Sequence, residues 1–204
     1  MAVAVEYGIK PQTQTLDKNP PTPLQEENLG GKETDKNIIL ILISAPLLHE
    51  DKITTVEALS IRQEIDAIIS VLEKIPALVE IEVIVEIATS QNLQRVLSRK
   101  IKPLIIHFIG HGMQTGEGTA LILEDKLGIA RPFLESELRI LLDGKNQPPC
   151  QIALLNACHS EGLADPLLDS HIPHLIAINA EDRILDVGAR YFAEAFYYAL
   201  FSQS

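Results

Sequence analysis

The chain of 204 residues is poor in cysteine and has no long apolar run, and each shortage excludes a class of protein. Its two cysteines, Cys150 and Cys158, lie eight residues apart and form neither a disulfide framework nor a CxxC metal pair. This usage is typical of a reducing compartment, so we expect a cytoplasmic protein. The longest mainly apolar run, residues 38–48, is interrupted by Ser44 and Pro46 and falls short of the roughly 20 residues that span a bilayer.

Positive charge is also scarce, because 17 Lys and Arg stand against 28 Asp and Glu, for a formal net charge of -11. Proteins that bind nucleic acid or anionic membranes present clustered Lys and Arg, so we expect neither partner. A negative potential favours cationic ligands, and a basic peptide suits this chain better than a phosphate-rich molecule. The N-terminus has no basic start followed by a long apolar stretch, so the sequence predicts no secretion signal.

The composition changes near residue 36. Residues 1–36 are rich in Pro, Gln, Thr and charged side chains, with almost nothing to bury, which predicts a disordered N-terminal arm. Residues 37–204 hold enough apolar side chains for one domain with a full core.

Strand-like and helix-like patterns alternate along this domain. Apolar runs predict five core strands and one short extra strand, over about 37–44, 78–88, 102–110, 151–157, 173–179 and 119–125. Amphipathic or capped segments predict helices over about 54–74, 90–100, 131–144 and 186–201. The alternation predicts an α/β fold, a mainly parallel sheet covered by helices on both faces, with ligands at the carboxyl ends of the strands.

Several details of these helices follow from the pattern. We expect Glu64 on the polar side of the first helix, Ser90 as the N-cap of the second and Pro132 in the first turn of the third. The last helix is expected to bury a stripe of Ala189, Phe192, Ala193, Phe196 and Leu200.

Polar loops follow the third and fourth core strands. His111 lies between two glycines after one strand, and Cys158 follows the other. Neighbouring parallel strands lie about 4.8 Å apart, so an imidazole and a thiol at these ends can share one cleft. We predict His111 as base and Cys158 as nucleophile, since the imidazole can take the thiol proton or, as imidazolium, lower the thiol pKa. The amides of the glycines beside His111 could donate to an oxyanion.

Four blocks, "IIHFIGHG", "ALILED", "ALLNACHSEGLA" and "ILDVGARYFAEAFYYAL", are similar in order and spacing to those of CHAT domains, caspase-like cysteine peptidases related to separases and metacaspases. The resemblance covers about residues 38–201. It implies a caspase-like three-layer fold and peptide-bond hydrolysis, with the backbone amides of Gly112 and Cys158 as the oxyanion hole. His111 precedes Cys158 by 47 residues, close to the roughly 50 of caspases, although the caspase signature around the cysteine is not met.

The resemblance also bears on substrate and partner. Acidic side chains in related peptidases often read a basic residue before the scissile bond, and we predict that role for Glu181 and Asp182. Helix capping is the alternative for these acidic residues, and we assign Asp186 to it. Family members are often fused to TPR repeats and activated by a partner or ligand. This chain has no repeats, which leaves its activator open.

Metal and nucleotide sites are weaker interpretations. His107 and His111 lie in a strand-like run, where four residues at about 3.3 Å each separate them by roughly 13 Å, too far to share one zinc. We expect His107 to be a core histidine that hydrogen-bonds within the loop network. The glycines after residue 109 miss the GxGxxG spacing by one position. We therefore predict no metal or organic cofactor.

The sequence thus predicts a cysteine endopeptidase acting on protein or peptide substrates through a Cys158–His111 dyad, regulated by a partner, a ligand or processing. A catalytically idle caspase-like module for binding or assembly is the alternative. A zymogen blocked by residues 1–36 or by the loop over 113–119 is a third. Cys150 is expected to be structural or merely a surface residue, and His159 to be a structural residue or one at the rim of the substrate site.

Overall fold

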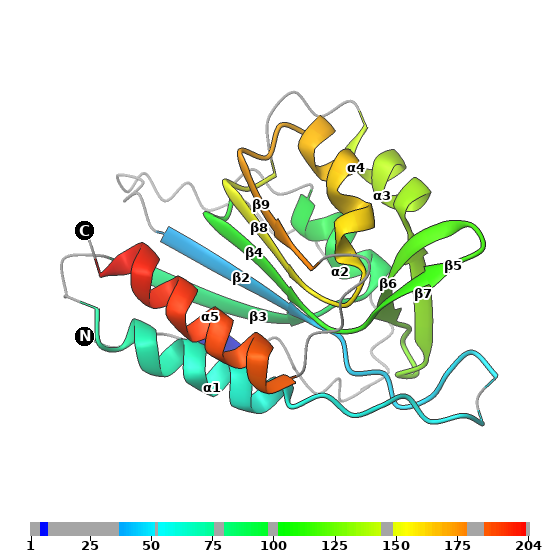
Figure 1. Cartoon of the computed structure of the whole chain (residues 1–204), viewed down its shortest axis with the longest axis horizontal. Coiled ribbons are helices and arrows are strands. Elements are labelled where there is room, and N and C mark those ends of the chain that lie inside the picture. The colour runs from blue at the N-terminus through cyan, green and yellow to red at the C-terminus, as the bar shows by residue number, and fades with distance from the viewer. Residues whose placement is uncertain are drawn as a thin grey trace, which may run out of the picture.

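A six-stranded parallel sheet forms the centre of the computed structural model, which describes residues 5–7, 37–51, 53–75, 80–97, 102–143, 149–178 and 186–202 (Figure 1). The strand order is β1-β3-β2-β4-β8-β9. The strands are β1 (Val5–Tyr7), β2 (Asn37–Ile43), β3 (Ile81–Ile87), β4 (Ile105–Ile109), β8 (Ile152–Asn156) and β9 (His174–Ala177). All neighbouring strands run parallel.

Helices cover both faces of this sheet (Figure 1). The helices α1 (Ile61–Leu72) and α5 (Asp186–Phe201) lie side by side on one face. The other face carries α2 (Ser90–Leu97), α3 (Glu135–Leu142) and α4 (Ala164–Asp169). The predicted α/β class is therefore confirmed, and the layers are consistent with a caspase-like three-layer fold.

Strand burial follows from position in the sheet. The continuous apolar run of β2 lies between β3 and β4, with Ile39 and Ile41 packed toward α1 and α5 and Leu40 and Leu42 toward the opposite core. In β3, next to the edge strand, fully buried residues alternate with partly exposed ones. The predicted difference between a run buried on both faces and an alternating strand near an edge is confirmed.

A second, antiparallel sheet replaces the glycine-rich loop expected after His111. It consists of β5 (Gly112–Thr115), β6 (Gly118–Glu124) and β7 (Ala130–Leu134). The extra strand expected over 119–125 is confirmed as β6. Pro132 lies in β7, not in a helix as predicted, because β7 is an edge strand, where proline breaks little of the ladder. The helix α3 begins three residues later, where the Glu137 carboxylate accepts the Leu134 amide at 3.0 Å.

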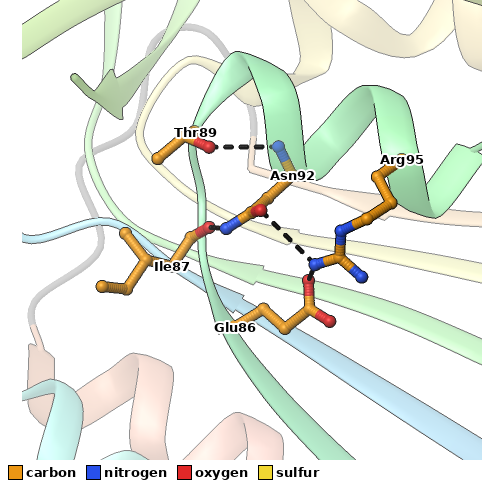
Figure 2. Close-up of polar contacts among 5 residues, drawn as sticks. All are labelled: Glu86, Ile87, Thr89, Asn92 and Arg95. Atoms are coloured by element: carbon orange, nitrogen blue, oxygen red, sulfur yellow. Dashed lines mark hydrogen bonds and ion pairs between the residues drawn. The ribbon is translucent and has the colours of Figure 1, made fainter. Parts of the chain in front are cut away.

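The cap of α2 differs from the prediction by one residue. Figure 2 shows Thr89, not Ser90, accepting the Asn92 amide on its hydroxyl at 3.0 Å. The Asn92 side chain returns to the Ile87 carbonyl at 2.8 Å, and Arg95 pairs with the Glu86 carboxylate. These contacts tie α2 to the end of β3.

The last helix buries a different stripe from the one expected. Its fully buried residues are Ala189, Ala193, Tyr197 and Phe201, at four-residue spacing. Phe192 is 46% exposed, because the two small alanines bring α5 close to its neighbours along a line that leaves position 192 outside. Phe196 and Leu200 pack at the margin of the core.

The N-terminal segment expected to be disordered contains β1, which pairs with Val83–Val85 of β3 at the sheet edge. Those three residues therefore belong to the sheet, and the rest of 1–36 lies outside the described residues. None of the helices in the described ranges combines the length and the apolarity needed to cross a bilayer.

We predict that Gly162→Ala destabilises the fold. Gly162 follows the Cys158 turn, and a Cβ there would overlap the buried Thr119 side chain, which is itself bonded to Gln114 at 2.9 Å. Urea unfolding should show a loss of about 1–3 kcal/mol, the usual cost of overpacking. The control is Gly116→Ala, where nothing lies within 4 Å of the added methyl group. Equal stability of the two variants would contradict the packing at this contact.

Candidate functional site

A cleft lies at the carboxyl ends of β4 and β8, where the first turns of α1 and α5 close its wall. His111, Cys158, Glu64, Asn156 and Ala189 are among its lining residues. β4 and β8 are neighbours in the sheet, with Ile109 opposite Asn156. The two residues predicted as a dyad therefore line the same cleft.

The turn that carries Cys158 is held on both sides. Ala157 is buried and Cys158 is half-buried, and His159 then adopts a left-handed conformation with φ of 59°, which turns the chain sharply into the 3-10 helix η1 (Ser160–Leu163). The buried Ser160 hydroxyl donates to the Leu155 carbonyl at 3.0 Å and accepts the Ile178 amide at 2.9 Å. These two bonds fasten the turn to the ends of β8 and β9.

His111 is oriented by a main-chain carbonyl. Its Nε2 lies 2.8 Å from the Glu57 carbonyl oxygen. A carbonyl only accepts, so Nε2 carries the proton and Nδ1 is left as the basic nitrogen of the neutral ring. This partner leaves no signal in the sequence, because any residue at position 57 supplies a carbonyl.

The small sheet braces both halves of that contact. The Ile122 amide of β6 donates to the His111 carbonyl at 2.9 Å. In the segment before α1, the Val56 amide donates to the Leu47 carbonyl at 3.1 Å, and the Leu47 amide donates to the Gly128 carbonyl in the β6–β7 turn at 3.0 Å. The small sheet of β5, β6 and β7 thus holds both the His111 backbone and the segment that carries the Glu57 carbonyl.

Glycine at position 112 lets the two loops touch. A Cβ on Gly112 would overlap the Cys158 carbonyl oxygen and lie 3.3 Å from the Ala157 Cβ. The Gly110 amide also donates to the Asn156 carbonyl at 3.2 Å. The backbones of Gly112 and Cys158 are therefore in contact, which is compatible with the shared oxyanion role predicted for them.

The two cysteines differ in their surroundings. Cys150 is fully buried in the core on the α2 face, and burial raises the pKa of its thiol to about 12. Cys158 is half-buried in the cleft. Thiolate chemistry near neutral pH is thus disfavoured at Cys150.

A buried polar chain adjoins the cleft. Asn156 Nδ2 donates to Glu64 Oε1 at 2.7 Å, His107 Nε2 lies 3.4 Å from the same oxygen, and His107 Nδ1 lies 3.2 Å from the Tyr197 hydroxyl. Complete burial lowers the pKa of His107 to about 3, so its imidazole is neutral, although the Glu64 carboxylate nearby would favour the charged form. Burial, with the Glu64 charge as a lesser cause, raises the pKa of Tyr197.

Glu64 is 5% exposed, so its predicted place on the polar side of α1 is wrong. It lies three residues after Ile61 and four before Ile68, both buried, and this spacing is the signal that could have identified it.

Glu181 and Asp182 lie outside the described residues, and Asp186 is described only as the first residue of α5. Within the described ranges, no group of three His, Cys, Asp or Glu side chains could hold a metal ion. His107 and His111 make separate contacts, one in the core and one at the cleft.

We predict that iodoacetamide modifies Cys158 at least about 10-fold faster than Cys150 near neutral pH, since the Cys150 thiol is buried with a raised pKa. Peptide mapping by mass spectrometry after timed quenching measures both rates in one sample. Cys158→Ser, which retains Cys150, checks the assignment. Equal rates at the two cysteines would argue against a reactive Cys158.

No protein-family model matches the chain, and comparison with curated proteins gives no match either. The resemblance to CHAT domains therefore rests on the four sequence blocks.

Proposed function

We propose that the chain is a cysteine endopeptidase of the CHAT type, with Cys158 as nucleophile and His111 as base. The observation that carries this proposal is the placement of His111 and Cys158 in one cleft at adjacent strand ends, with His111 Nε2 on the Glu57 carbonyl. That bond leaves Nδ1 to exchange a proton with the thiol, as a peptidase base must do.

The first half of the reaction forms a thioester. Cys158 Sγ bonds to the carbonyl carbon of the scissile peptide, while the thiol proton moves to His111 Nδ1. The backbone amides of Gly112 and Cys158 donate to the carbonyl oxygen as it becomes an oxyanion. His111 then passes its proton to the leaving amine as the C–N bond breaks.

The second half restores the enzyme. Water attacks the thioester carbon and gives its proton to His111 Nδ1. The tetrahedral intermediate collapses with cleavage of the C–S bond, and His111 returns the proton to the sulfur. The products are a carboxylic acid and an amine, with no change in oxidation state.

The chemistry favours basic stretches of protein or peptide as substrates. The net charge of -11 attracts them, and Glu181 and Asp182 would read a cationic side chain before the scissile bond. The reaction needs no metal or organic cofactor. We further propose cytoplasmic activity, in keeping with the two unpaired thiols, and control by a protein partner, a ligand or processing of the N-terminal segment.

Cys158→Ala and His111→Ala should each abolish cleavage of a proteome-derived peptide library, because one removes the nucleophile and the other the base. Mass spectrometry of the products measures the loss and shows which residue precedes the cut. Cys150→Ala is the matched control and should cleave at the wild-type rate.

Retention of cleavage in both variants would contradict the proposed roles of Cys158 and His111. If the wild-type protein, alone or after removal of residues 1–36, cleaves nothing and Cys158 is no more reactive than Cys150, the idle binding module is the better description.

A further inference from the structure

Glu64 is the buried carboxylate among the residues that line the cleft, and it lies on the apolar side of α1. Burial of a carboxylate is unfavourable by several kcal/mol unless hydrogen bonds or charges compensate it. Core packing alone would be better served by an aliphatic residue, as at Ile61, Ile65 and Ile68 of the same helix. Its contacts show what the carboxylate does instead.

The first contact is with Asn156, where both loops of the site meet. The Asn156 carbonyl accepts the Gly110 amide at 3.2 Å, and Gly110 directly precedes His111. Cys158 follows Asn156 by two residues, and both residues line the cleft. A change in the position of Asn156 therefore moves the base and the nucleophile relative to each other.

Glu64 fixes the direction in which the Asn156 amide points. An ionised carboxylate only accepts, so the Asn156 nitrogen must face Glu64 Oε1, and its oxygen is directed away from it. The charged acceptor also strengthens this bond relative to one between two neutral groups.

His107 and Tyr197 support the carboxylate from behind. Among the described residues, His107 Nε2 has no hydrogen-bond partner, and it lies 3.4 Å from Glu64 Oε1, which favours the tautomer with the proton on Nε2. With the proton on Nε2, His107 Nδ1 accepts from the Tyr197 hydroxyl at 3.2 Å. A polar chain thus runs from Tyr197 of α5 through His107 of β4 to the vicinity of Glu64 of α1, whose Oε1 accepts the hydrogen bond from Asn156.

The geometry assigns Glu64 as a positioning residue for the candidate peptidase site. It holds Asn156, and through Asn156 the spacing of the Cys158 and His111 loops, while the His107 imidazole, bonded to Tyr197, lies against Glu64. This assignment rests on the proposed function, because Glu64 is not placed on any reacting atom.

The test uses the full chain and measures iodoacetamide alkylation of Cys158 from pH 6 to 9, together with the midpoint of thermal unfolding. Glu64→Gln should lower the rate near neutral pH by about 10-fold, since small misplacements of catalytic groups have effects of this size. Loss of a nearby negative charge would by itself raise the rate, because it favours the thiolate. The direction of change therefore separates positioning from electrostatics.

A reciprocal exchange supplies the second measurement. Asn156→Asp places two carboxylates at hydrogen-bond distance and should slow alkylation at least as much as Glu64→Gln. The double variant Glu64→Gln with Asn156→Asp restores a donor and an acceptor with the original net charge, so its rate should return to within about 3-fold of wild type. A double variant as slow as Asn156→Asp alone would overturn the assignment.

Matched controls guard against a general loss of structure. Glu73→Gln removes an exposed charge near the end of the same helix and should leave the rate unchanged. Tyr197→Phe removes only the hydroxyl behind His107 and should slow alkylation about 2-fold to 3-fold, whereas the exposed Tyr198→Phe should not. Unfolding midpoints close to that of the wild type in Glu64→Gln and Tyr197→Phe assign the slower rates to positioning.

His111→Ala distinguishes failure of the positioning role of Glu64 from failure of the proposed dyad. If it slows alkylation while Glu64→Gln matches or exceeds the wild-type rate, Glu64 is not a positioning residue and the proposed dyad stands. If His111→Ala itself leaves the rate unchanged, the proposed dyad fails, and the assignment of Glu64 fails with it.

Discussion

The parallel pairing of β4 with β8 is the constraint on which the rest of the site depends. It sets Ile109 opposite Asn156. The next residues, Gly110 and Ala157, have small side chains, so the loops that follow the two strands can approach each other closely. The Gly110 amide bonds to the Asn156 carbonyl, and Gly112 lies against the Cys158 carbonyl. A shift of one residue in this pairing would turn every side chain of β8 to the opposite face and remove the shared cleft.

Two hydrophobic cores pack against the paired strands β4 and β8, one on each face of the sheet. Leu40, Phe108 and Leu155 belong to the core under α2, α3 and α4, while Ile41, Ile105 and Ile152 belong to the core under α1 and α5. The polar chain through His107 and Glu64 crosses the second core. The buried Glu64 carboxylate is tolerated in this core because Asn156 donates a hydrogen bond to it. The His107 imidazole, bonded to the Tyr197 hydroxyl, adds a second polar group beside it.

The sequence predicts the features that depend on local pattern. The continuous run of β2, the alternation of β3 and the polar ends of β4 and β8 each carry their own signal, so the sheet and the two residues of the proposed dyad can be located. Pro132 shows where the pattern fails, because proline suits a first helical turn and an edge strand alike, and only the neighbouring β6 decides between them. Glu64 shows the second kind of failure, because its burial depends on Asn156 and His107, which are remote in sequence.

Because a main-chain carbonyl orients His111, the residue at position 57 can change without loss of this contact. A substitution at position 57 changes the side chain but leaves the carbonyl. A comparison of residue identities between sequences therefore cannot detect the group that orients His111. What matters is the path of the backbone between β2 and α1, which is docked on the β6–β7 turn through Leu47 and Gly128. An insertion or a bound partner that shifts this path would release the imidazole without altering either residue of the proposed dyad.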